Sequence, residues 1–199
     1  MTDDHIRAAY AARAAEYTSL LGSVEDMHEL DRQRIKRWGQ SIDGPVIDVG
    51  CGPGHWTDFL HRHGVQVQGV DLVPEFVDGA RARFPDVSYR VASLRDLGVA
   101  ASSLHGVLAW YSLIHVHPGE LPAVLAEIAR SLTRGGRLLI GFFEGAVAQP
   151  LEHAVAPAYY WSVGQMRLML SEARFVVSEV ETRQDPCNRP HAAVEAIAS

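Results

Sequence analysis

The stretch of sequence that decides the fold is Val46-Ile47-Asp48-Val49-Gly50-Cys51-Gly52-Pro53-Gly54. Its first four residues have the apolar, β-branched character of a buried strand, and its last five form a glycine-rich turn. A helical pattern follows, with Trp56, Phe59 and Leu60 on one face and a stop at Gly64. Such a turn lets a ligand approach the backbone closely and reach the N–H groups that open the helix. The stretch therefore predicts a ligand site at the end of a strand.

Short apolar runs and helical stretches alternate along the rest of the chain. We expect further strands at 65–70, 87–91, 106–110, 137–143, 175–180 and 192–198. Helices are expected after Pro74, over 121–132 and from Ser162, which caps a helix together with Gln165. The alternation predicts an α/β fold with a doubly wound, mostly parallel sheet of seven strands and helices on both faces. Because no helix separates the last two strands, they predict an antiparallel C-terminal hairpin at one edge.

Residues 1–40 precede the alternating pattern and are predicted to form two helices. One stripe runs through Ile6, Tyr10 and Tyr17, and another runs through Ile35 and Trp38. Tyr10 and Tyr17 lie seven residues apart, so a single helix would present both rings on one face. We expect 1–40 to be a helical lid and 41–199 to hold the ligand site, within one domain overall.

The composition argues against several classes of function. The chain has 199 residues and a net charge of −6, which disfavours electrostatic binding to nucleic acid or to anionic membranes. No apolar run approaches the roughly 20 residues of a membrane helix, and the acidic N-terminus is unlike a signal peptide. Two cysteines, Cys51 and Cys187, are too few for a disulfide framework, so a cytoplasmic location is expected. The single lysine, Lys36, lies in a charged helical stretch and argues against Schiff-base chemistry.

Two carboxylates narrow the choice of ligand. Asp71 ends the second predicted strand, 21 residues after Gly50, where an acidic residue can accept hydrogen bonds from both hydroxyls of a ribose. An adenosine-containing ligand is therefore indicated. His55 stands where a dinucleotide-binding turn has a third glycine or alanine, and it is bulky for close packing there. Asp48 would repel a pyrophosphate, so it favours a cationic ligand that carries an amino acid.

The sequence resembles the class I S-adenosylmethionine-dependent methyltransferases, and among them the small bacterial enzymes that act on small molecules. The resemblance covers nearly the whole chain and is carried by residues 46–57, 68–71, 91–97, 108–116, 132–139 and 160–162. It implies a Rossmann-like fold, with S-adenosyl-L-methionine as the cofactor and S-adenosyl-L-homocysteine as the product. One position departs from the pattern. Ser93 stands where the family often has an acidic residue that bonds the adenine amino group, and Asp96 is a nearby alternative.

The resemblance also implies the cofactor contacts. The glycines of the turn would pass beneath the methionine part, Asp48 would orient its ammonium group, and Asp71 would hold the ribose. Leu72 and Leu94 would enclose the adenine, and Leu94 would offer its backbone N–H. The full expected set is Tyr10, Tyr17, Asp48, Gly50, Cys51, Gly52, Gly54, Trp56, Asp71, Leu72, Ser93, Leu94, Trp110 and Tyr111. For the two N-terminal tyrosines the alternative is a packing stripe, and Cys51 is expected only to fill the turn.

An acceptor site is expected beside the methyl group. His115 follows a central strand and is the candidate general base, which is needed only where the acceptor starts protonated. The alternative for His115 is a packed loop residue. The expected acceptor contacts are His115, Glu144, Tyr159, Tyr160 and Trp161. Their aromatic rings favour a small, planar or apolar acceptor, methylated on oxygen or nitrogen. The alternative for this aromatic group is an ordinary cap on the core.

No metal site is expected. His61 and His63 point apart on a helix, and neither carboxylate nor cysteine stands at ligand spacing from His115 and His117. Two other functions stay open. One is a non-catalytic S-adenosylmethionine-binding protein or partner subunit, and the other is a nicotinamide-dependent oxidoreductase, which Asp48 disfavours. A monomer or homodimer with a small-molecule partner is expected.

Overall fold

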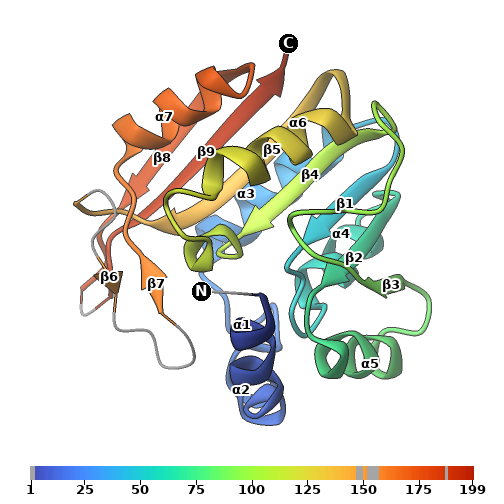
Figure 1. The fold of residues 1–199 in the computed structure, drawn as a ribbon. Coiled ribbons are helices and arrows are strands. Elements are labelled where there is room, and N and C mark those ends of the chain that lie inside the picture. The colour runs from blue at the N-terminus through green and yellow to red at the C-terminus, as the bar shows by residue number, and fades with distance from the viewer. Residues whose placement is uncertain (1–2, 147–149, 152–156, 187) are drawn as a thin grey trace.

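Seven strands form one sheet in the computed structural model of the protein, which describes residues 3–146, 150–151, 157–186 and 188–199 (Figure 1). The strands are β1 (Val46–Val49), β2 (Val67–Asp71), β3 (Ser88–Val91), β4 (Leu104–Trp110), β5 (Leu132–Phe143), β8 (Phe175–Arg183) and β9 (His191–Ala198). Their order is β3-β2-β1-β4-β5-β9-β8. Strands β1 to β5 pair in parallel, whereas β9 is antiparallel to both of its neighbours. The predicted doubly wound sheet and its C-terminal hairpin are confirmed.

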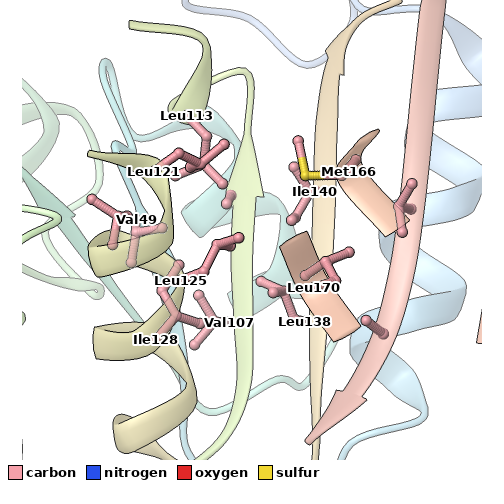
Figure 2. Packing of buried hydrophobic residues seen from close by; sticks show 14 of the residues in the cluster. Val49, Val107, Leu113, Leu121, Leu125, Ile128, Leu138, Ile140, Met166 and Leu170 are labelled. Atoms are coloured by element: carbon pink, nitrogen blue, oxygen red, sulfur yellow. The ribbon is translucent and has the colours of Figure 1, made fainter. Parts of the chain in front are cut away.

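Helices cover both faces of this sheet. They are α3 (Glu29–Gln40), α4 (His55–Arg62), α5 (Pro74–Arg83), α6 (Leu121–Ser131) and α7 (Val163–Glu172). Helices α6 and α7 pack on one face, where Figure 2 shows Leu125 and Leu170 beside Val107 and Leu138. In α7, Ser162 caps the helix as predicted, because its hydroxyl accepts from the Gln165 backbone N–H at 3.1 Å.

Helices α3 and α4 pack on the opposite face through Trp38 and Leu60. Strand β1 contributes to both cores, with Ile47 facing α6 and Val46 facing α3. A central parallel strand is buried on both sides, which explains its nearly continuous apolar sequence. Asp48 is the exception, a carboxylate that is only 2% exposed.

The N-terminal segment corrects one prediction. In place of one helix, the structure has α1 (Asp3–Ala11) and α2 (Ala14–Leu21), which lie beside the arrowhead end of β4 in Figure 1. Tyr10 and Tyr17 therefore do not share a helix face, although their ring centroids lie 5.6 Å apart. Both rings also contact Phe76, at 5.9 and 5.5 Å. This tertiary packing outweighs the strong local helix propensity of the alanine-rich sequence.

Three further features differ from the sequence prediction. Strand β5 begins at Leu132 rather than 137, because Leu132 pairs with Leu104 across an irregularity in the ladder. A short 3₁₀ helix, η1 (Leu113–His115), follows β4, and β6 (Pro150–Leu151) pairs with β7 (Ala158–Tyr159). Within the described ranges, no helix has the length and apolar character needed to cross a membrane.

Candidate functional site

The glycine turn after β1 has the backbone conformation that its sequence predicts. Gly50, Gly52 and Gly54 have φ values of +71°, +52° and +84°, in the left-handed region that favours glycine. A Cβ at Gly50 would lie 2.4 Å from Cβ of Ser112, whereas a Cβ at Gly52 would meet no atom within 4 Å. Packing against Ser112 thus requires a glycine at position 50, whereas the space beside Gly52 is open to a ligand.

Asp71 faces this turn from the end of β2. Its Oδ2 accepts a hydrogen bond from the Gly52 backbone N–H at 2.8 Å, and its Oδ1 accepts from the Val73 N–H at 2.8 Å. Burial raises the pKa of this carboxyl to about 6. The two carboxylate oxygens have about four acceptor positions, so the carboxyl keeps capacity for a ligand beyond its bonds to the backbone N–H groups of Gly52, Val73 and Leu72.

Asp48 is a second buried carboxyl beneath the same turn. Its Oδ2 accepts a hydrogen bond from the Thr57 hydroxyl at 2.7 Å. The pKa of Asp48 is raised to about 7, mainly by burial and to a smaller extent by the nearby Asp71, against the opposing effect of the Thr57 hydrogen bond. A cation placed between these two carboxyls would favour their ionised forms.

Two cavities meet at this turn. The first, here called the lid cavity, lies between α1 and the strand ends and includes Tyr10, Asp71, Leu72, Ser93, Leu94 and His115 in its wall. The second, here called the turn cavity, includes Asp48, Cys51, Trp56 and Phe143. The residues that line both are Tyr10, Tyr17, Gly50, Gly52, Trp110 and Tyr111. Of the predicted cofactor contacts, Gly54 alone lines neither of these two cavities.

Gly54 has a structural role that its sequence context did not indicate. A Cβ at this position would lie 2.7 Å from Cβ of Ala80, and the Tyr89 hydroxyl donates to the Gly54 carbonyl at 3.1 Å. Gly54 therefore allows close packing of α4 on α5 and β3. Cys51 is also enclosed, and burial raises the pKa of its thiol well above the usual range. Cys187 lies outside the described residues.

His115 sits on η1 and is joined to α1 by a hydrogen bond. Its Nδ1 lies 2.9 Å from the Pro157 carbonyl, and its Nε2 lies 2.7 Å from the Tyr10 hydroxyl. A carbonyl only accepts, so Nδ1 carries the proton and Nε2 accepts from Tyr10. Burial lowers the pKa of His115, which keeps the ring neutral near pH 7. His115 lines the lid cavity, and Nε2 is its proton-accepting nitrogen.

A buried polar network behind Tyr111 was missed by sequence reasoning. The Tyr111 hydroxyl lies 2.5 Å from Nδ1 of His191, whose Nε2 lies 3.9 Å from Asp31. Arg183 donates to Asp31 at 2.8 Å. Tyr111 also has a φ of +56°, which is rare for a bulky residue. The members come from α3, β8, β9 and the turn after β4, so no local motif signals them.

The predicted acceptor residues beyond His115 do not line the two cavities. Trp161 is buried in the core, and Tyr160 packs on Gly145. Tyr159 contacts the His117 ring edge-on at 5.8 Å, and the Glu144 backbone bonds Pro190. Phe143, which precedes Glu144, does line the turn cavity.

The site's polar atoms suit an organic ligand with cationic and hydroxyl groups. Two buried carboxyls provide acceptors, and the Ser112 hydroxyl, which lines the lid cavity, is buried without a partner. Such orphaned atoms are expected where a ligand completes the hydrogen bonding. Across the described ranges, no group of three or more His, Cys, Asp or Glu side chains could hold a metal ion.

Comparisons with known proteins identify a matching family and several relatives of this chain. A family described as "Methyltransferase domain" matches residues 46–136. The ubiquinone biosynthesis O-methyltransferase of Xanthomonas oryzae pv. oryzae is 30% identical over 138 residues, which are 66% of this chain and 57% of that protein. The chain thus spans little more than half the length of the curated relatives it matches.

Solved structures share the fold at low sequence identity. The 1,6-didemethyltoxoflavin-N1-methyltransferase of Burkholderia thailandensis has a TM-score of 0.73 and 22% identity, over 97% of this chain and 90% of that one. The [4+2]-cyclase SpnF has a TM-score of 0.82 and 14% identity, over 100% of this chain and 97% of that one. One of these similar structures is a cyclase, so the fold alone does not determine the reaction.

Proposed function

We propose a function from the premise that the chain belongs to the class I S-adenosylmethionine-dependent methyltransferases. The protein transfers the methyl group of S-adenosylmethionine to an oxygen or nitrogen of a small, planar or apolar metabolite. The observation that carries this proposal is the pairing of Asp71 with the open Gly52 position at the junction of the two cavities. A carboxylate and an unobstructed backbone at a strand end suit a ribose and the chain attached to it.

The residues present fit this cofactor. Asp71 has acceptor positions for the ribose hydroxyls, and Leu72 and Leu94 line the lid cavity as apolar surfaces for the adenine. Asp48 lines the turn cavity, where its carboxyl can hold the cofactor's ammonium group. The positive charges of the ammonium and the sulfonium would offset the cost of the two buried carboxylates. Residues 1–40 would act as the lid and 41–199 as the transferase domain.

Positioning is the main contribution of the chain to methyl transfer. When bound, S-adenosylmethionine supplies a methyl carbon that the positive sulfonium makes electrophilic. Tyr10, Tyr17 and Tyr111 line both cavities, so their rings surround the junction where the methyl would lie. Aromatic faces stabilise a cation and exclude water. Holding an acceptor in line at about 3 Å can supply most of the rate enhancement of such a displacement.

His115 would act as the general base for an acceptor that starts protonated. The Pro157 carbonyl holds the Nδ1 proton, which leaves Nε2 as the proton-accepting atom. The Tyr10 hydroxyl now occupies that position at 2.7 Å. An acceptor hydroxyl would take the place of the Tyr10 hydroxyl and pass its proton to Nε2 as the methyl bond forms.

The acceptor class is supported by the cavity walls and by the relatives. Trp56, Trp110 and Phe143 give the turn cavity an aromatic lining that suits a planar or apolar molecule. The Xanthomonas relative is named for O-methylation, and the Burkholderia structure is named for N1-methylation.

The test is calorimetric titration with S-adenosylmethionine, S-adenosylhomocysteine and NAD⁺, followed by turnover. Micromolar binding of the first two, weakened at least about tenfold in Asp71→Ala, supports the cofactor assignment. Binding of NAD⁺ in their place would overturn it. Formation of S-adenosylhomocysteine is then measured with phenols, carboxylic acids and amines. Binding without turnover on any of them favours a non-catalytic cofactor-binding protein.

A further inference from the structure

Asp3, the first residue of α1, joins the lid to the loop that follows β3. Its carboxylate accepts a hydrogen bond from the Ser93 hydroxyl at 2.7 Å and pairs with the Arg95 guanidinium. Glu120 holds the same guanidinium from its other end, at 2.7 Å. Asp3, Ser93 and Arg95 all line the lid cavity. The carboxylate is therefore fixed at the cavity wall by two donors of the loop.

Asp3 keeps acceptor positions that the loop does not use. An ionised carboxylate has about four such positions, and Ser93 and Arg95 take two of them. The Ser93 hydroxyl donates its hydrogen bond to Asp3, and its oxygen accepts from the Arg95 backbone N–H at 3.1 Å. In the described part of the chain, no backbone carbonyl accepts from the backbone N–H of Leu94. This wall thus offers a carboxylate acceptor and an N–H donor close together.

The wall belongs to the part of the lid cavity that is remote from the turn cavity. Gly50 and Gly52 line both cavities, whereas Asp3, Ser93 and Leu94 line only the first of the two. Much of the remaining wall is apolar and comprises Leu72, Val73, Phe76 and Ala92. A ligand seated here needs a flat apolar body with a donor and an acceptor on one edge. Adenine has such an edge, because its exocyclic amino group lies beside ring nitrogen acceptors.

We propose that Asp3 accepts a hydrogen bond from the exocyclic amino group of the cofactor's adenine, while the Leu94 N–H donates to the adjacent ring nitrogen. The proposal rests on the proposed function, since it requires an adenosine-containing cofactor. Ser93 then acts by orienting Asp3, and Asp96 is not needed for this contact. Because Asp3 belongs to α1, recognition of the adenine depends on a closed lid.

The experiment compares S-adenosylhomocysteine with S-inosylhomocysteine by calorimetry. In the inosine compound a carbonyl oxygen replaces the amino group, and the adjacent ring nitrogen carries a hydrogen. The wild-type protein should prefer the adenosine compound by about tenfold or more, because the carboxylate would face an oxygen and lose its donor. Asp3→Ala and Asp3→Asn should reduce this preference at least about threefold, since alanine lacks the acceptor and asparagine offers both a donor and an acceptor. The preference that remains comes from the Leu94 N–H, which faces a ring N–H in the inosine compound.

Asp4→Asn is the matched control. It makes the same change of charge one residue further along α1, where Asp4 pairs with Arg7 at 2.9 Å and does not line the lid cavity. This variant should keep the wild-type preference. The role of Asp3 would be overturned if the wild type did not prefer the adenosine compound, or if both Asp3 variants kept the full wild-type preference. The proposed function would still stand in either case. A wild-type protein that binds neither compound would overturn the proposed function and this inference with it.

Discussion

The hydroxyl of Tyr10 lies 2.7 Å from Nε2 of His115, although 105 residues separate them in the sequence. Tyr10 belongs to α1 and His115 to the short helix that follows the central strand β4. The hydrogen bond therefore joins α1 to the carboxyl edge of the sheet. Both groups are buried and neutral near pH 7, because burial raises the pKa of the tyrosine and lowers that of the histidine.

Replacing Tyr10 by Phe should loosen the lid while keeping its packing. The ring contacts with Tyr17 and Phe76 would remain, whereas the hydrogen bond to His115 would be lost. A net hydrogen bond contributes about 0.5–1.5 kcal/mol, so we expect the dissociation constant for S-adenosylhomocysteine to rise by roughly 2- to 10-fold. Limited proteolysis between α2 and α3 should become faster without ligand. Unchanged affinity and cleavage would show that this hydrogen bond does not hold the lid.

Two glycines offer a matched test of the turn. Gly52 and Gly64 both have a positive φ, of +52° and +84°, and a Cβ at either would meet no atom within 4 Å. Alanine at each should destabilise the fold by about 1–2 kcal/mol, because both positions are left-handed. Only Gly52→Ala places its methyl group in the cavities, so it should also weaken cofactor binding by about tenfold or more.

Urea unfolding and calorimetry separate these two effects. Gly64 follows the C-cap of α4 and lines neither cavity, so Gly64→Ala should bind the cofactor as the wild-type protein does. Equal affinities in the two variants would show that no ligand passes over Gly52.

The sheet and the glycine turn could be predicted because their signals are local. Gly50, Gly52 and Asp71 each follow directly from a strand pattern, and parallel strands bring their ends to one edge of the sheet. The break between α1 and α2 could not be predicted, since nothing in the alanine-rich sequence favours it. It depends on the packing of Tyr10 and Tyr17 against Phe76.

The remaining site residues lacked any local signal. Asp3 meets Ser93 across 90 positions, and Asp31 meets Arg183 across 152. No sequence motif signals either pair. The first pair depends on where α1 packs, and the second depends on the order of the last strands in the sheet. Trp161 and Tyr160 are predicted as acceptor contacts because they precede a capped helix. In the structure Trp161 is buried in the core, Tyr160 packs on Gly145, and neither lines the two cavities.

The buried carboxyl of Asp48 predicts an unusual dependence of stability on pH. Its pKa is raised to about 7 in the folded protein, so folded molecules bind a proton that the unfolded chain releases from about pH 4 upward. This group therefore makes the free energy of unfolding fall as the pH rises from about 4 to 7, with no recovery above that range. Asp48→Asn should melt at a higher temperature than the wild type at about pH 8, and the gap should close near pH 4.

The cofactor should reverse this effect of Asp48. An ammonium group beside the carboxylate favours its ionised form, so binding at about pH 6.5 should release protons from the wild-type protein. Titrations in buffers of different ionisation enthalpy measure that release, and Asp48→Asn should reduce it. A melting difference that is constant at every pH would mean that the carboxyl titrates as it does in the unfolded chain.

The pair formed by Tyr111 and His191 predicts strongly non-additive effects on stability. Tyr111→Phe would leave Nδ1 of His191 buried without its partner at 2.5 Å, and this should cost about 1–3 kcal/mol. His191→Leu should cost a similar amount, because the Tyr111 hydroxyl would then be orphaned. Removing both polar groups leaves neither unpaired, so the double variant should lose less stability than the sum of the two single losses, by about 1 kcal/mol or more.

Burial lowers the pKa of His191 to about 4, so this coupling between Tyr111 and His191 should be constant between about pH 6 and 8. Urea unfolding of the four proteins at both pH values measures it, and strict additivity would show that the short contact contributes nothing to folding.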